Sequence, residues 1–220
     1  MKKIRAIILG STGATGQEIL KLLLKNSDIS EVVILVRRKI YLKHEKLKIY
    51  QIDFSNLSLY KKLIKGDIFI SALGTTLNDA GSKNNQFLVD YTYQYELAKI
   101  ASENNIKHYT LISSIGANQN SMFYYLKIKG LLEYNIKKLN FRCIHIFQPP
   151  SLIRQPDLIR KGERISIFIF NLIYKFGFAK TLKPISVEDL AIKVVNEIIH
   201  SSNEGVYVYK PKDISFDVYK

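Results

Sequence analysis

A tyrosine followed four positions later by a lysine is the pattern in this chain best suited to proton transfer. Side chains at that spacing lie on the same face of a helix, and a lysine ammonium favours the phenolate form of the tyrosine. A phenol that titrates near ~10 needs such help to act close to neutral pH. The chain has 14 tyrosines, and the pairs with this spacing are Tyr95 with Lys99, Tyr125 with Lys129, and Tyr134 with Lys138.

Position along the chain favours the second of these pairs. Ser113 and Ser114 end an apolar run that is typical of a strand, and Tyr125 begins the next helical pattern. The serines and the Tyr125/Lys129 pair are therefore expected at one edge of a sheet. Tyr95 is expected in the middle of the preceding helix, and Tyr134 lies further along its helix, away from that edge.

A glycine-rich turn near the start of the chain is the element expected to position a cofactor. An apolar run ends at Gly10, Gly13 and Gly16, and a helical pattern begins at Gln17. A strand, a glycine turn and a helix in this order predict a dinucleotide site. Gly10 allows a tight turn, Gly13 allows the backbone to approach a pyrophosphate, and Gly16 allows close helix packing. The predicted cofactor contacts of this turn are Gly10, Ser11, Thr12, Gly13, Ala14, Thr15 and Gly16.

Two arginines indicate which dinucleotide the turn binds. Arg37 and Arg38 end the second apolar run, roughly 20 residues beyond Gly16, where an NAD-binding protein places an acidic residue for the ribose 2′-hydroxyl. A guanidinium there suits a 2′-phosphate instead. The pattern favours NADP(H), and the alternative is a pair of surface arginines at a strand end.

Short apolar runs alternate with longer helical patterns along the chain. This alternation predicts an α/β protein with a single-domain Rossmann-type, doubly wound parallel sheet that has helices on both faces. The strands are expected at Ala6–Leu9, Val32–Val36, Leu47–Ile52, Ile68–Leu73, Tyr109–Ser114, Cys143–Phe147 and Val206–Tyr209. The main later helices are expected at Gln86–Asn104, at about Phe123–Leu139, and from Pro184 to about Ile199.

The length of 220 residues suits one domain, 1–220, with a smaller substrate-side portion from about 150 to 220. In that portion Ser151–Lys161 is expected to be a loop and Ser186 to be a helix N-cap. Ile165–Phe178 is apolar but shorter than the ~20 residues of a spanning helix. We therefore expect no transmembrane segment and a soluble, cytoplasmic protein.

Charge and cysteine content limit other functions. The net charge of +14 could attract nucleic acid or an acidic membrane, but the lysines are spread along the chain and no recognition motif is present. We favour a solvated basic surface and expect no specific nucleic-acid partner. The single cysteine, Cys143, excludes an internal disulfide and is interpreted as a core residue. The four histidines are scattered, so no metal site is predicted.

Several segments together resemble the short-chain dehydrogenases/reductases. They are closest to the atypical branch that includes the Tat-interacting oxidoreductase homologues, and the resemblance covers nearly the whole chain. Two positions differ from that branch, because Gln148 replaces its usual arginine and Pro150 its usual glycine. The segments that carry the resemblance are Ser113–Ala117, Tyr124–Gly130 with Glu133, Phe147–Leu152 and Pro184–Ala191.

The resemblance implies roles for individual residues. Tyr125 would be the general acid or base, and Lys129 would lower its pKa and hold the nicotinamide ribose. Ser113 or Ser114 would hydrogen-bond a substrate carbonyl, and we favour Ser114. The remaining cofactor contacts implied in this way are Asp53 and Phe54 beside the adenine, and Ala72, Leu73 and Gly74 along the cofactor.

Two classes of function follow. The first is an NADPH-dependent reductase that transfers a hydride to a small-molecule carbonyl substrate. The second is a non-catalytic NADP(H)-binding module that regulates a protein partner, since a fold does not by itself establish a function. The complete Ser/Tyr/Lys set favours the first. The sequence identifies neither the substrate nor the oligomeric state.

Overall fold

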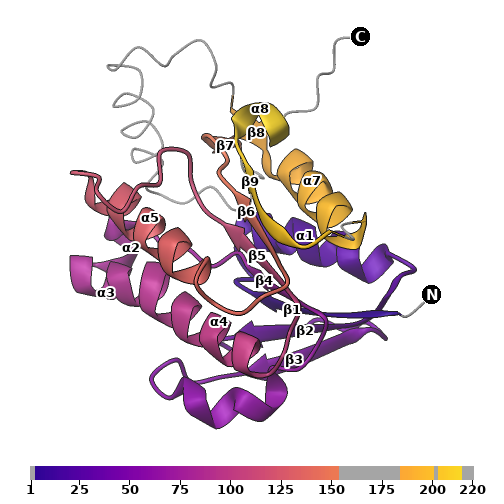
Figure 1. Ribbon diagram of the computed structural model, residues 1–220. Helices are drawn as coiled ribbons and strands as arrows, with labels where there is room; N and C mark the ends of the chain where they lie inside the picture. The colour runs from indigo at the N-terminus through magenta and orange to yellow at the C-terminus, as the bar shows by residue number, and fades with distance from the viewer. Residues whose placement is uncertain (1–2, 154–183, 201–202, 215–220) are drawn as a thin grey trace.

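A seven-stranded parallel sheet forms the centre of the protein (Figure 1). The computed structural model describes residues 3–153, 184–200 and 203–214. The strand order is β3-β2-β1-β4-β5-β6-β9, and every neighbouring pair in it is parallel. The strands are β1 (Ile4–Leu9), β2 (Ile29–Val36), β3 (Leu47–Gln51), β4 (Ile68–Ser71), β5 (His108–Ile112), β6 (Cys143–Phe147) and β9 (Gly205–Tyr209).

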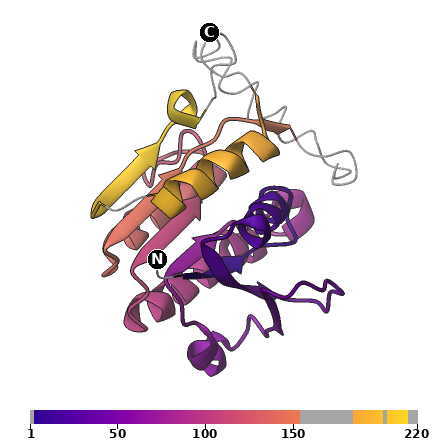
Figure 2. The same ribbon diagram turned by 90° about the vertical axis from the view of Figure 1, so that its right-hand side faces the viewer.

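Helices cover both faces of this sheet (Figures 1 and 2). One core cluster joins α1 and α7 to one face, and a second joins α4 and α5 to the other. The predicted doubly wound fold is therefore confirmed. The helices are α1 (Ala14–Lys25), η1 (Leu57–Leu63), α2 (Leu77–Ala80), α3 (Lys83–Phe87), η2 (Leu88–Thr92), α4 (Tyr93–Glu103), α5 (Tyr124–Ile136), α7 (Val187–His200) and α8 (Pro211–Ile214).

The long helix expected over Gln86–Asn104 is interrupted by the π-helical turn η2. The side-chain amide of Gln94 donates hydrogen bonds to the backbone oxygens of Val89 and Asp90, at 3.2 and 3.1 Å. Gln94 also accepts a bond of 2.8 Å from the Ser71 hydroxyl at the end of β4. A polar side chain thus ties the wide turn to the sheet, which apolar periodicity does not reveal.

The described residues near the C-terminus belong to the same sheet and core. β9 pairs with β6, and α7 packs on the α1 face. Ser186 accepts a hydrogen bond of 2.9 Å from the Asp189 amide, as expected of an N-cap. The loop expected from Ser151 instead enters a short strand, β7 (Leu152–Ile153), because it pairs with β8 (Ile185–Ser186). The apolar stretch Ile165–Phe178 lies outside the described residues.

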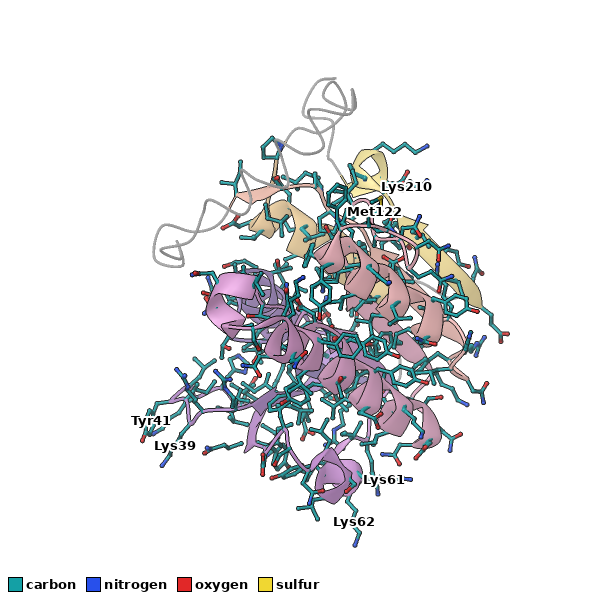
Figure 3. All side chains as sticks on the ribbon, turned by 90° about the vertical axis from the view of Figure 1, so that its left-hand side faces the viewer. Lys39, Tyr41, Lys61, Lys62, Met122 and Lys210 are labelled. Carbon is teal, nitrogen blue, oxygen red and sulfur yellow. The ribbon has the colours of Figure 1, made fainter. Side chains whose placement is uncertain are left out.

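No helix among the described residues is long and apolar enough to cross a membrane. Basic side chains extend outward from separate parts of the fold, as Lys39, Lys61, Lys62 and Lys210 show (Figure 3). They come from the β2–β3 connection, from η1 and from the chain after β9. This distribution agrees with the interpretation of the +14 charge as a solvated surface.

Candidate functional site

The three positions of the turn after β1 require or tolerate glycine for different structural reasons. Gly10 has φ +85°, and a Cβ there would lie 2.5 Å from the Leu73 amide nitrogen. A Cβ at Gly16 would lie 2.1 Å from the Gly10 carbonyl oxygen, so α1 packs directly on the turn. At Gly13 a Cβ would meet Gly10 oxygen at 3.4 Å. The protein itself requires glycine at positions 10 and 16, whereas Gly13 faces a space that a ligand could use.

The residues of this turn fit a bound pyrophosphate. Gly13 is the N-cap of α1 and supplies no side-chain cap, and the first turn of α1 contains no acidic residue. The backbone N–H groups of that turn are the positive end of the helix and suit an anion. The Ser11 hydroxyl is buried, and it has no hydrogen-bond partner within the described part of the chain. A phosphate oxygen would satisfy it.

The neighbouring strand ends carry the residues predicted for the adenosine half of the cofactor. Arg37 and Arg38 directly follow β2, and both are exposed. Asp53 follows β3, and the hydroxyl and backbone N–H of Ser55 donate to it at 2.7 and 2.9 Å. These two hydrogen bonds hold the pKa of the Asp53 carboxyl below its usual value. The Phe54 ring packs against Tyr93, with centroids 5.0 Å apart.

Lys129 lies inside the molecule at the carboxyl end of β5. Its side chain is 3% exposed, and its Nζ lies 3.5 Å from the Ile112 carbonyl oxygen. A Cβ built on Gly74 would lie 4.0 Å from this Nζ, so the end of β4 passes beside it. Tyr125 is in the first turn of α5, one helical turn before Lys129. Gly74, which follows β4, and the α5 residues Tyr125 and Lys129 thus meet at one edge of the sheet.

The other two Tyr/Lys pairs have different surroundings. Tyr95 stacks on Tyr91 with ring centroids 5.6 Å apart. Tyr134 is 45% exposed, and the Nζ of Lys138 lies 3.8 Å from its ring centroid rather than beside its hydroxyl. Of the three pairs, Tyr125/Lys129 is thus the one at the carboxyl edge with a buried lysine.

The two candidate serines are engaged differently. The Ser113 hydroxyl donates a hydrogen bond to the carboxylate of Glu133, which is 5% exposed. The Ser114 hydroxyl makes a weaker contact of 3.3 Å with the Ile115 carbonyl oxygen. The Ser114 hydroxyl is therefore held less firmly than that of Ser113, and the preference for Ser114 stays a prediction.

Two buried carboxylates near the site were not predicted to have a role there. Asp90, on η2, is fully buried and accepts a hydrogen bond of 2.9 Å from the Thr75 amide, which fixes the loop after β4. Glu133 accepts hydrogen bonds from the side-chain amide of Gln148, at 3.0 Å to each carboxylate oxygen.

The interpretation of the histidines as scattered is wrong. His108 and His145 come together with Cys143, and one ligand atom of each lies within 4.8 Å of the others. The reason is strand register, because His108 is the pairing partner of Cys143 across β5 and β6. Cys143 is fully buried, as a core residue should be.

Comparisons with known proteins agree with this geometry. Residues 10–140 match the family described as NAD(P)H-binding. The chain is 35% identical to protein FMP52, mitochondrial, of Candida albicans, over 83% of this chain and 82% of that protein. It is 31% identical to protein fmp52, mitochondrial, of Aspergillus niger, over 94% and 95%. It is also 33% identical to protein HTATIP2 of Rattus norvegicus, over 72% of this chain and 69% of that protein.

Solved structures have the same fold at low sequence identity. WbmH of Bordetella bronchiseptica, solved in complex with NAD+, superposes with a TM-score of 0.70 at 16% identity, covering 94% of this chain and 75% of that one. The oxidoreductase ylbE of Lactococcus lactis gives a TM-score of 0.68 at 18% identity, covering 94% and 89%.

The relatives contradict one prediction. A cytoplasmic location was expected because no targeting segment was recognised, but the fungal relatives are named as mitochondrial proteins. Composition and fold do not encode a compartment, so the expectation of a cytoplasmic protein is wrong.

The family of the chain is clear from the match over residues 10–140 and from the FMP52 and HTATIP2 relatives. The chain belongs to the NAD(P)H-binding family and is an atypical short-chain dehydrogenase/reductase with a Rossmann fold.

Proposed function

We propose that this protein is an NADPH-dependent reductase of a small carbonyl compound. The observation that carries the proposal is the buried ammonium of Lys129, one helical turn from Tyr125 and beside Gly74. Burying a charged lysine costs free energy unless the ammonium is paired or hydrogen-bonded, for example to a phenolate or a ligand hydroxyl. A positive charge at this place stabilises a phenolate and can hold a ribose hydroxyl.

The chain's own residues divide the chemistry between them. The nicotinamide, when bound, supplies the hydride. Tyr125 donates the proton that the reduced carbonyl oxygen needs, and Lys129 lowers the cost of the resulting phenolate. Ser114 donates a hydrogen bond to the same oxygen and holds the substrate in place. Ser113 is assigned a supporting role, because its hydroxyl is bonded to Glu133.

The preference for NADP(H) over NAD(H) rests on Arg37 and Arg38. Both are exposed at the end of β2, and Asp53 follows the end of the neighbouring strand β3. A guanidinium pairs well with a phosphate and offers nothing specific to a ribose hydroxyl. We therefore assign the 2′-phosphate of NADP(H) to these two side chains.

A substrate panel tests the proposal. Purified protein is incubated with NADPH and a set of aldehydes and ketones, and nicotinamide absorbance is followed. We expect consumption of NADPH with at least one carbonyl and slower consumption of NADH. Product analysis must find the alcohol in an amount equal to the NADPH consumed.

The second candidate function has a distinct result in the same experiment. A regulatory NADP(H)-binding module binds NADPH tightly in a titration but consumes none with any carbonyl. That outcome contradicts the reductase and leaves cofactor binding intact. If neither binding nor consumption is found, both proposals fail.

A further inference from the structure

We propose that His108, Cys143 and His145 form a zinc site at the amino ends of β5 and β6. This edge of the sheet is opposite to the one that carries the glycine turn and Lys129. His108 and Cys143 pair across the two strands, and His145 follows two positions later. Since residues two apart on a strand point to the same face, all three side chains lie on one face, against α7.

The distances suit zinc after a small adjustment. Zinc binds imidazole nitrogen and thiolate sulfur at ~2.0–2.3 Å, so ligand atoms in a tetrahedral site are about 3.5 Å apart. The Sγ of Cys143 and the Nε2 of His145 are already 3.1 Å apart, and all the ligand atoms are within 4.8 Å of one another. To complete the site, the imidazole of His108 would move closer to the other two ligand atoms. Its Nδ1 is buried and has no hydrogen-bond partner among the residues described.

Hydrogen bonds fix His145 in the tautomer that a metal requires. The Tyr209 hydroxyl donates to the Glu197 carboxylate at 2.9 Å. Its oxygen can then accept only from a protonated Nδ1 of His145, 3.0 Å away. The unprotonated Nε2 therefore faces Cys143. Metal-bound histidines in proteins characteristically donate their other ring N–H in this way.

A cavity next to His108 lets an ion reach the cluster, and the nearby positive charge of Arg142 is partly neutralised. His108 lines a cavity of about 200 Å³, and Asp67 and Lys3 also line it. Arg142, next to Cys143 in sequence, is paired with Glu204 at 2.8 Å. Two imidazoles and a thiolate are ligands typical of zinc rather than of magnesium or calcium.

Binding is a balanced exchange of a proton for a metal ion. The Cys143 S–H bond breaks, the sulfur binds Zn²⁺ as a thiolate, and the proton goes to solvent. The two histidines bind as neutral imidazoles and release none. One proton is thus expected per metal ion bound, and no electron is transferred.

Metal titration of the purified chain tests the site. After treatment with a chelator, Co²⁺ is added as a spectroscopic probe and Zn²⁺ as the competitor. We expect one equivalent of Co²⁺ to produce a thiolate-to-cobalt charge-transfer band, which Zn²⁺ then removes. Release of about one proton is followed with a pH indicator in weak buffer.

Variants assign the signal to these residues. Cys143→Ser should remove the charge-transfer band, and His108→Gln should weaken metal binding more than about tenfold. His44→Gln, in the exposed β2–β3 connection, is the matched control and should bind like the parent. If Cys143→Ser does not fold, His108→Gln decides, because His108 is half-buried and lies at a strand end. No cobalt band in the parent, or equal metal affinity in the parent and His108→Gln, overturns the proposal.

Discussion

The two ends of β5 and β6 carry different kinds of polar groups. At the carboxyl ends, the buried Lys129 and the Ser114 hydroxyl lie at the same edge of the sheet as the glycine turn, which follows β1. At the amino ends, His108, Cys143 and His145 come together, and His108 lines a cavity. The first end is built for a large anionic ligand, because backbone and glycines leave it room. The second is built for a small cation, because three side chains converge on one point.

This difference predicts that the two ends can be disabled separately. Changes at the glycine turn should abolish dinucleotide binding and leave metal binding intact. Changes at the histidine cluster should do the opposite. Sites without shared partners act additively.

The largest expected effect comes from the glycine turn. Gly16→Val should prevent stable folding, because even its Cβ would overlap the Gly10 carbonyl oxygen at 2.1 Å. Overpacking of this kind costs at least about 1–3 kcal/mol. Gly13→Val should fold, because its Cβ contact at 3.4 Å is tight but tolerable, yet should lose NADPH binding. Thermal melting and a fluorescence titration measure the two outcomes. A folded Gly13→Val protein with parent affinity would place the phosphates elsewhere.

Lys129→Met should affect both catalysis and cofactor affinity. The ammonium is expected to stabilise the phenolate and to hold the ribose, so turnover should fall by about 10²-fold or more and NADPH should bind roughly tenfold more weakly. Lys138→Met is the control, because Lys138 lies over the ring of exposed Tyr134. An unchanged NADPH affinity in Lys129→Met would remove the lysine from the cofactor site.

The arginines should set cofactor preference with a smaller effect. Replacing both Arg37 and Arg38 by alanine should remove a preference for NADPH over NADH of about tenfold, since charge-assisted phosphate contacts contribute ~1.5–3 kcal/mol. Replacing both Lys210 and Lys212 by alanine is the control for net charge, because these exposed lysines follow β9 at the opposite edge of the sheet from β2 and β3. Equal affinity of the parent for both cofactors would contradict this assignment.

The smallest effect is expected on NADPH affinity in a variant of the histidine cluster, and it tests most directly whether the two ends of the strands are independent. His108→Gln should leave NADPH affinity within about twofold of the parent while metal binding weakens by more than about tenfold. Calorimetric titration of NADPH into the metal-loaded and chelator-treated protein gives the same information without a mutation. A strong dependence of NADPH affinity on the metal would mean that the two ends are coupled.

The sequence allowed prediction of the first end far better than of the second. The glycine turn is contiguous, so its spacing and the strand before it could be recognised directly. Each strand of the main sheet was also expected within a few residues, because buried parallel strands form continuous apolar runs. Three strand ends lie earlier than expected: β3 ends at Gln51, β4 at Ser71 and β5 at Ile112, where the chain leaves the ladder to form the site loops.

The remaining features depend on register and on side-chain hydrogen bonds. The pairing of His108 with Cys143 joins residues that are far apart in sequence, and no local pattern encodes it. The π-turn at Leu88–Thr92 depends on Gln94 reaching back to the turn and across to Ser71. The hydrogen bond that holds the Ser113 hydroxyl depends on the position of Glu133, which only the packing of α5 determines.

The most direct test of the central claim compares Tyr125→Phe with Tyr134→Phe. The first substitution removes the hydroxyl proposed to donate the proton, and the second removes the same atom from the exposed pair on the same helix. NADPH affinity and NADPH consumption are measured for both with a carbonyl substrate from the panel. We predict that Tyr125→Phe binds NADPH like the parent but turns over 10²–10⁴-fold more slowly, as loss of a general acid requires, while Tyr134→Phe matches the parent in both. Parent-like turnover in Tyr125→Phe would contradict the account.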